Sequence, residues 1–314
     1  QGGRTIKFVC KRLLLMIPVL IGISFVLFSI MEFTPGDPAQ LILGEGATKE
    51  EIAELREEMG LNDNFLVRYF RYIVNALQGD FGTSYRTGKA VVEEVLPRFP
   101  ITLRLAFFGI CGAVIIGIPL GIISAIKQYS VMDTVCTITA LTLTSIPTFW
   151  LGLLLMLAFA LHLGWLPATG VKEWTGYILP CVTLTLGTMA MILRMTRSTM
   201  LETIRQDYIR TARAKGANTR RVVFKHALRN ALLPVITYVG MTFGIQLGGT
   251  VIIESVFSVP GMGSLMITSI RMKDSPTLMA SVLLAALCAG IVNLIVDVLY
   301  SYIDPRIKSQ YVKG

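Results

Sequence analysis

The sequence predicts an all-α membrane protein with six transmembrane helices, and three observations carry that prediction. Hydrophobic residues make up 53% of the chain and charged residues only 16%, with a mean hydropathy of +0.64. A soluble chain of this length normally needs more charge. Six apolar runs are each about long enough to cross the hydrocarbon of a bilayer as a helix. The Lys and Arg residues are also distributed unevenly between the connecting segments.

Each apolar run can satisfy its backbone polar groups within a membrane only as a helix. None alternates polar and apolar residues, so a transmembrane β-barrel is excluded as the fold. The first run follows a basic segment but precedes no small-residue cleavage site, and we interpret it as a span and not as a signal peptide. The six predicted spans are Leu13–Met31, Leu105–Ile126, Thr134–Leu161, Trp174–Leu193, Asn230–Ile253 and Ser275–Val296.

The charge distribution predicts the orientation. With the N-terminus inside, the cytoplasmic segments hold 18 of the 29 Lys and Arg residues. The long first loop, Thr34–Ile101, holds seven Lys or Arg against eleven Asp or Glu. This asymmetry follows the positive-inside rule and predicts that both termini are cytoplasmic. The net charge of +9 is therefore better explained by membrane topology than by nucleic-acid binding.

The first loop is too long for a simple turn and predicts a small helical subdomain, or a pair of helices lying on the membrane. In the segment 48–60, Thr48 is an expected N-cap, Glu51 its capping-box partner and Gly60 a stop. The segment 62–79 predicts a second amphipathic helix. The predicted organisation is residues 1–33, tail and first span; 34–101, extracytoplasmic loop; 102–303, five-span core containing a cytoplasmic loop at 194–229; and 304–314, cytoplasmic tail.

Four prolines interrupt the later spans: Pro119, Pro147, Pro180 and Pro234. Membrane helices tolerate proline where neighbours satisfy the freed carbonyl groups. Each proline is equally consistent with a passive kink and with a helix that lines a pathway and must bend.

The cytoplasmic segment between the fourth and fifth spans is the most informative part of the chain. "DYIRTARAKGANTRRVVFKHALRNALLP", from Asp207 to Pro234, carries seven Lys or Arg against one acid. We expect one continuous helix through 198–216 and a second over 219–230, joined near Gly216. Anionic lipid headgroups would explain the charge. They would not explain the small residues Ala212, Ala214, Gly216 and Ala217, which permit close approach by another protein.

This segment resembles the cytoplasmic EAA-type loop of type I ABC-importer permeases, in the dipeptide/oligopeptide/nickel branch. The generic loop begins with Glu where this chain has Arg210, and its Leu-Pro comes later here, at Leu233-Pro234. Further matches extend along nearly the whole chain. They are "PGDP" at 35–38, "GDFGTS" at 79–84, "SIPTFWLG" at 145–152 and "ESVFSVPGMG" at 254–263.

The resemblance implies a type I ABC-importer permease fold in the bacterial cytoplasmic (inner) membrane. It also implies a second homologous permease subunit, two cytoplasmic ATPases and an extracytoplasmic substrate-binding protein. ATP and Mg would then be bound by the partner subunits, with no cofactor in this chain, and no enzymatic chemistry is expected of it. The implied cargo is a dipeptide or oligopeptide, with nickel or a metal chelate as the alternative within the branch. The remaining contacts are with membrane lipid.

Three groups of candidate site residues follow. The ATPase-coupling loop that the resemblance implies comprises Asp207, Tyr208, Arg210, Thr211, Ala212, Arg213, Ala214, Lys215 and Gly216. Pro260 and the glycines near it predict a sharp re-entrant turn, so an outer gate or binding-protein contact is expected, with a bare loop as the alternative, at Glu254, Phe257, Pro260, Gly261 and Gly263. The candidate translocation path comprises Ser145, Pro147, Asn293 and Asp297.

Ionisable residues inside spans raise the alternative of an ion-coupled secondary transporter. Asp297 could relay protons, or form a hydrogen bond with Asn293, four residues away on the same face of the sixth span, or with a neighbouring chain. Glu32 and Arg104 lie near the outer ends of spans. No Walker-type phosphate loop is present. The five Cys residues form no CxxC pair, and with His162 and His226 as the only histidines a metal site or disulfide framework is not expected.

Overall fold

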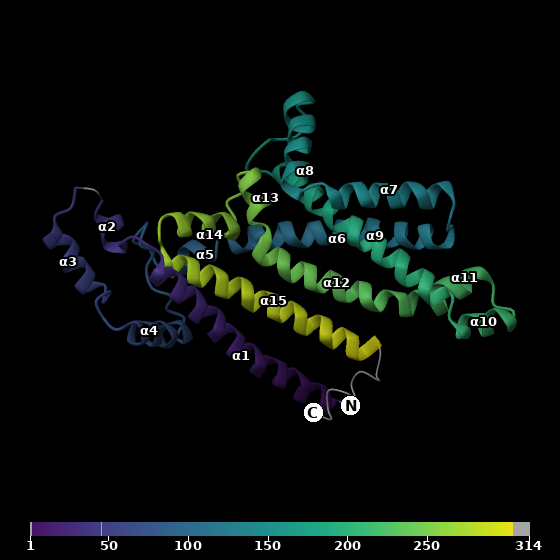
Figure 1. Ribbon diagram of the computed structural model, residues 1–314, viewed down its shortest axis with the longest axis horizontal. Coiled ribbons are helices and arrows are strands. Elements are labelled where there is room, and N and C mark those ends of the chain that lie inside the picture. The colour runs from purple at the N-terminus through teal and green to yellow at the C-terminus, as the bar shows by residue number, and fades with distance from the viewer. Residues whose placement is uncertain (1, 45, 304–314) are drawn as a thin grey trace.

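The computed structural model describes residues 2–44 and 46–303, so the predicted tail at 304–314 lies outside the described residues. A bundle of long helices runs side by side, with a helical appendage at one end and a helical hairpin at the other (Figure 1). The long helices are α1 (Gly2–Phe33), α6 (Phe99–Ile126), α9 (Ile178–Ile204), α12 (Leu228–Gly249) and α15 (Ser275–Ile303). The remaining elements are α2 (Pro38–Leu43), α3 (Lys49–Glu58), α4 (Phe65–Leu77), α5 (Val91–Val95), α7 (Val131–Ser145), α8 (Thr148–Leu155), η1 (Met156–His162), η2 (Trp174–Tyr177), α10 (Asp207–Ala214), α11 (Thr219–Arg221), η3 (Val222–Ala227), α13 (Val251–Val256) and α14 (Met262–Arg271).

Five of these stretches are long and apolar enough to cross a membrane, and a sixth span results if α7 and α8–η1 are taken together. Those two pieces meet at an angle of 103°. The predicted third span therefore lies at the expected position in the sequence, but it is two helices at an angle and not one continuous helix. Ile146 adopts an extended backbone because the residue before a proline is driven out of the helical region, and Pro147 begins the new direction.

The other three prolines do not break their helices. Pro119 and Pro234 lie inside α6 and α12, and Pro180 lies in the first turn of α9, where its missing N–H costs no hydrogen bond. The predicted fourth span is longer than expected, since α9 continues to Ile204.

Small residues set the closest helix contacts in the bundle. At Gly121 of α6, an added Cβ would lie 2.8 Å from the Leu193 carbonyl oxygen of α9. Gly117 of α6 meets α9 in the same way, at the Met189 carbonyl oxygen. Close backbone approach at small residues is the main way in which membrane helices gain packing energy. The α6–α9 pair is therefore the central contact of the bundle, with α7 and α12 packed against it.

The helices predicted for the first loop are confirmed. Thr48 caps α3, its side chain accepting from the Glu51 amide while the Glu51 carboxylate accepts from the Thr48 amide. These bonds, led by the one from the Thr48 backbone, lower the pKa of Glu51. The second helix is α4, N-capped by Asn64.

Candidate functional site: a coupling hairpin and an outer turn

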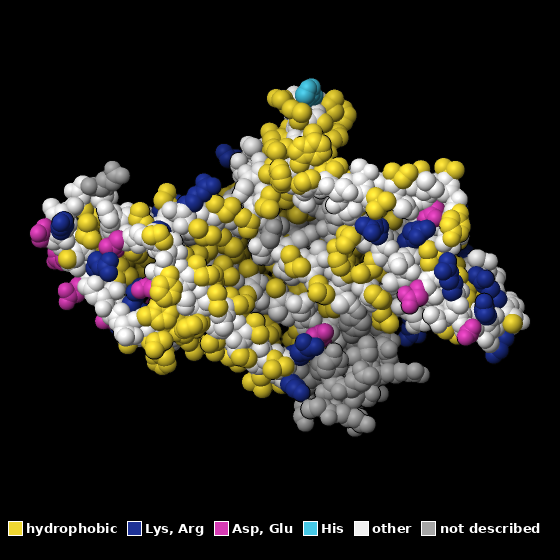
Figure 2. Space-filling view, in the orientation of Figure 1, with side chains coloured by type: hydrophobic (Ala, Val, Ile, Leu, Met, Phe, Trp, Pro, Cys, Tyr) yellow, Lys and Arg dark blue, Asp and Glu magenta, His cyan; other side chains and the backbone are white. Residues whose placement is uncertain are grey.

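The hairpin predicted to be cytoplasmic contains α10, which is short and presents most of its side chains to solvent. Ile209 is its one fully buried residue, packed in a cluster with Met200 of α9 and with Val222 and Val223 of η3. The candidate residues Asp207, Tyr208, Arg210, Thr211, Arg213, Ala214, Lys215 and Gly216 are exposed, and Ala212 is half-buried. Lys and Arg side chains gather over this end of the molecule (Figure 2).

The predicted single helix over 198–216 is wrong, because the chain breaks between Ile204 and Asp207. Gln206 is extended, which starts α10 in a new direction. The sequence contains no Pro or Gly at this point. The break is a tertiary effect, since it brings Ile209 into the cluster with Met200. The Tyr208 hydroxyl also accepts a hydrogen bond from Asn230 of α12 at 2.9 Å, which ties α10 to the fifth span.

The predicted turn at Gly216 is confirmed. Gly216 has φ +81°, a left-handed conformation that glycine adopts without a steric penalty. Its amide donates to the Arg213 carbonyl, and the Ala217 amide donates to the Ala212 carbonyl, the pair of bonds that defines a Schellman C-cap. An added Cβ at Gly216 would meet nothing within 4 Å. The requirement for glycine inside this chain is therefore conformational, and the space around the turn is open to a partner.

An ion pair missed by the sequence analysis lies just before this hairpin. Arg197 of α9 donates to both carboxylate oxygens of Asp133, from Nε at 2.6 Å and from a terminal nitrogen at 2.8 Å. Asp133 is buried and also accepts from the Ser124 hydroxyl at 2.5 Å and the Tyr129 amide at 2.9 Å. We call these four residues the inner clamp. It fixes the α6–α7 turn, including Tyr129 at φ +65°, to α9, the helix that leads into the α10 hairpin.

A second polar tie joins the two helices on either side of the hairpin. The Gln246 side chain of α12 donates to the Thr188 hydroxyl of α9 at 3.0 Å, and both residues are buried. Because such a bond has no water to compete with it in a membrane, it holds α9 and α12 in register. The only sequence signal for this tie is an isolated glutamine in an apolar run.

At the opposite end of the bundle, α13 and α14 form the predicted re-entrant turn. Glu254 is fully buried at its centre. One carboxyl oxygen accepts from the Thr102 and Thr250 hydroxyls, both at 2.7 Å, and the other accepts from the Ser264 amide at 2.9 Å. Thr102 lies on α6, so the turn is locked to the central helix pair. The Glu254 side chain holds the turn from inside and offers no surface to a partner.

Gly261 and Gly263 of this turn are required because neighbouring atoms leave no room for a Cβ. An added Cβ at Gly261 would lie 2.5 Å from the Glu254 carboxyl group, and one at Gly263 would lie 2.6 Å from the Val251 Cα. Phe257 is buried, with its ring next to Gly152 of α8. Pro260 is exposed at the tip. The turn is therefore packed against the outer arm of the bent span.

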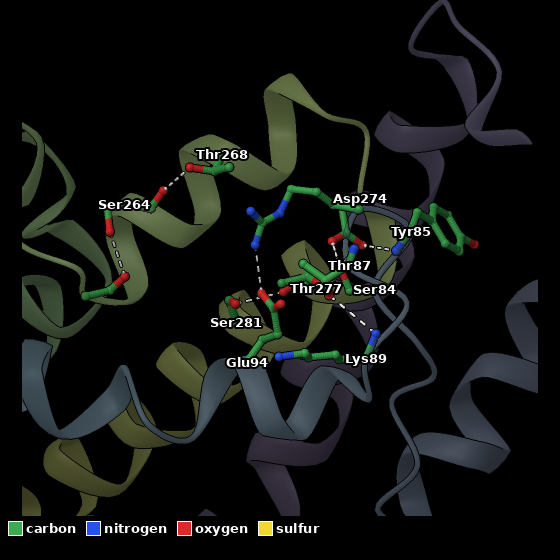
Figure 3. Close-up of polar contacts among 12 residues, drawn as sticks. Ser84, Tyr85, Thr87, Lys89, Glu94, Ser264, Thr268, Asp274, Thr277 and Ser281 are labelled. Atoms are coloured by element: carbon green, nitrogen blue, oxygen red, sulfur yellow. Dashed lines mark hydrogen bonds and ion pairs between the residues drawn. The ribbon is translucent and has the colours of Figure 1, made fainter. Parts of the chain in front are cut away.

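The first loop is clasped to the same end of the molecule. Asp274, between α14 and α15, is buried and accepts from the Ser84 hydroxyl at 2.5 Å and the Tyr85 amide at 3.1 Å (Figure 3). Burial raises the pKa of the Tyr85 hydroxyl. Lys273 adds a bond to the Thr34 carbonyl at 3.2 Å. The "GDFGTS" motif thus serves, through Ser84, to anchor the loop.

The four candidate path residues do not gather at one place. Ser145 and Pro147 are exposed at the bend between α7 and α8. Asn293 and Asp297 lie on α15, which α12 and α13 separate from α8 (Figure 1). Asp297 forms an ion pair with Arg12 of α1 at 3.0 Å, a partner that the sequence analysis did not name.

Comparison with known proteins decides the family. Residues 117–309 match the binding-protein-dependent transport system inner membrane component family, and residues 5–106 match the N-terminal region of such membrane components. The chain is a permease subunit of a type I ABC importer. It belongs to the dipeptide/oligopeptide permease family, as the resemblance implied.

Two relatives place the permease within that family. It is 44% identical to the dipeptide transport system permease protein DppB of Alkalihalophilus pseudofirmus, covering 96% of this chain and 99% of the relative. It is 42% identical to the glutathione transport system permease protein GsiC of Escherichia coli (strain K12), with the same coverage. The fold resembles the inward-facing MetNI methionine ABC transporter, with a TM-score of 0.56 at 19% identity over 68% of this chain and 97% of that one. The permease is accordingly a multi-pass protein of the inner membrane.

Proposed function

We propose that this permease imports small peptides, pairing with a second homologous permease subunit to enclose the pathway. Its N-terminal end and the α10 hairpin would face the cytoplasm, and the outer turn and first loop would face the substrate-binding protein. The positive-inside distribution of Lys and Arg supports this orientation. Two partner ATPases would bind ATP and Mg and carry out hydrolysis, leaving translocation to this chain.

The observation that carries the proposal is the shape of the coupling hairpin. A helix of eight residues is anchored through Ile209 and Asn230, while its remaining surface is basic and open. A groove on an ATPase could enclose that surface. Movement of the groove would then be passed to α9 and α12, which the Gln246–Thr188 bond holds together. The inner clamp would carry α7 along with α9, so the whole helix group would tilt as one body, in the manner of alternating access.

The outer turn supplies the other end of the mechanism. Glu254 locks it to α6, and Phe257 packs it against α8, so tilting of α9 and α6 would move the turn and the bend at Pro147 together. We propose that the turn gates the pathway at its outer end. Ser145 and Pro147 would lie on the pathway, where the partner permease completes it.

The cargo is inferred from the relatives. One relative is named for a dipeptide and another for glutathione, itself a small peptide, which favours peptides over nickel. The test is uptake by the complete complex in vesicles, with labelled dipeptide, glutathione and nickel offered separately. We expect ATP-dependent accumulation of a peptide. Accumulation of nickel alone would overturn the cargo. Uptake that follows a proton or sodium gradient without ATP would overturn the mechanism.

The coupling role is tested by Gly216→Arg in the same assay. Its side chain would enter the open space reserved for the ATPase, and we expect uptake to fall at least about tenfold, equivalent to 1.4 kcal/mol of coupling. Gly216→Asn is one control, since asparagine tolerates positive φ. Gly164→Arg is a second control. Gly164 also has a positive φ and open space around it, but it lies after η1, at the end of the helix bundle away from the α10 hairpin. Full uptake by Gly216→Arg would remove the hairpin from the coupling mechanism.

A further inference from the structure

The helix α4 carries a row of apolar side chains that nothing in the described part of the chain covers. Leu66, Val67, Phe70 and Leu77 are each more than half exposed. The opposite face of α4 is packed, with Phe65 and Tyr69 stacked edge-on against Phe25 and Phe28 of α1. A helix with apolar residues on both faces is typical of a protein core or a membrane, where neither face meets water.

The depth of α4 identifies what covers that face. The Tyr69 hydroxyl donates to the Ile21 carbonyl of α1 at 3.0 Å and bonds with the Ser24 hydroxyl at 2.9 Å. Ile21 precedes the end of α1 at Phe33 by 12 residues, or about 18 Å at 1.5 Å per residue. The hydrocarbon core of a bilayer is about 30 Å thick. The helix α4 therefore lies beside the spanning part of α1, within the thickness of the membrane, and not above it.

A groove opens next to α4 at the same depth. Its volume is about 440 Å³, and its walls come from α1, α4, α5 and α15. The lining includes Leu20, Ile73, Ala76, Val92 and Leu284. The one polar side chain in the lining is Ser24, and its hydroxyl lies within hydrogen-bond distance of the Ile21 carbonyl and the Tyr69 hydroxyl, which satisfy it. The groove therefore suits an apolar chain and offers nothing to a polar ligand.

Charged groups lie only at the other edge of α4, away from the groove. Arg68 pairs with Glu32 at 2.9 Å, and Arg71 pairs with Asp63 at 2.6 Å. Hydrophobic side chains cover the neighbouring surface from α4 along α1 and α15 (Figure 2). In this arrangement the charged edge of α4 lies toward the headgroups and its apolar face lies among the acyl chains.

We propose that the groove binds one acyl chain of a membrane phospholipid, with the exposed face of α4 embedded in the same leaflet. In the orientation proposed above, this is the outer leaflet. The lipid under α4 then holds the first loop in addition to the Asp274 bonds and the contacts of α4 with α1. The bound lipid becomes part of the structure that presents the loop to the outside.

The test uses the complete complex in vesicles that contain a phospholipid with a photoreactive diazirine in one acyl chain. After irradiation, the labelled residues are mapped by mass spectrometry. We expect label on groove residues of α4 and α15. We also expect the labelling of groove residues to fall about tenfold, equivalent to 1.4 kcal/mol, in Ala76→Trp and in Leu20→Trp. The two Trp rings fill the groove from two different helices. Val19→Trp is the control, because Val19 is exposed on the same helix outside the groove.

Two results would overturn the inference. One is labelling of groove residues that neither filling substitution reduces, which would mean that only bulk lipid is being detected. The other is cross-linking of a photoreactive residue at Phe70 to another subunit or to the binding protein, which would make α4 a protein interface. Labelling is read independently of uptake, so a failure of the peptide or coupling proposals leaves this result interpretable. If either filling variant fails to assemble, the other carries the same test.

Discussion

Substituting Arg197 should destabilise the permease more than substituting its ion-pair partner, Asp133. Arg197→Ala leaves Asp133 with only the Ser124 and Tyr129 bonds, and the Asp133 side chain is 6% exposed. Breaking a buried pair from one side costs about 3–5 kcal/mol, because the remaining charge stays buried without compensation. Asp133→Asn should cost less, since the Arg197 side chain is 26% exposed and can reach water.

The assay is the midpoint temperature of thermal unfolding of the detergent-purified complex, read from the loss of its gel-filtration peak on heating. At roughly 2–4 °C per kcal/mol, Arg197→Ala should lower the midpoint by about 6 °C or more. Arg205→Ala, on the exposed arginine just beyond α9, is the control and should change it little. The double variant Asp133→Asn with Arg197→Ala should be more stable than Arg197→Ala alone, because the orphaned carboxylate is gone. Strictly additive losses would refute the clamp, since non-interacting residues behave that way.

Two further substitutions test the ends of the proposed mechanism. Gly261→Ala places a Cβ against the Glu254 carboxyl group, which three hydrogen bonds hold in place; we expect a loss of about 2–4 kcal/mol of stability and most of the uptake, measured by melting and transport together. Unchanged melting would mean that the turn relaxes freely. Ile209→Ala should cost about 2–5 kcal/mol, confined to the hairpin. Uptake should then fall about tenfold with ATP hydrolysis retained, equivalent to 1.4 kcal/mol of coupling. Tyr208→Phe loses only the Asn230 bond, so its uptake should fall less than that of Ile209→Ala. Equal losses of uptake in the two variants would show that Ile209 does not anchor α10.

Local pattern was enough for the elements whose causes are local. The capping box of α3 and the Gly216 turn were predictable because their partners lie within about one helical turn of each other. Number and position of the spans followed from apolar length. The orientation stays a prediction from the positions of Lys and Arg. The family was recognisable from motifs spread over nearly the whole chain.

Other features were predictable in position but not in form. Pro147 marked an interruption, yet a 103° bend required the surrounding helices to direct α8 away from α7. The break before α10 had no proline or glycine to announce it, because burial of Ile209 causes it. Glu254 and Phe257 were expected at an outer gate, but their side chains turned out to hold the turn from within.

By itself, the sequence determined an all-α membrane protein with a basic hairpin, an outer turn and a helical first loop. Only the tertiary structure decided which polar residues meet. Asp133 and Arg197 are 64 positions apart, and Ser84 and Asp274 are 190 apart. The same holds for Tyr69 against α1, which sets α4 beside the apolar part of that helix. Periodicity and composition report on neighbours along the chain, whereas these contacts depend on how whole helices pack, so no local signal could specify them.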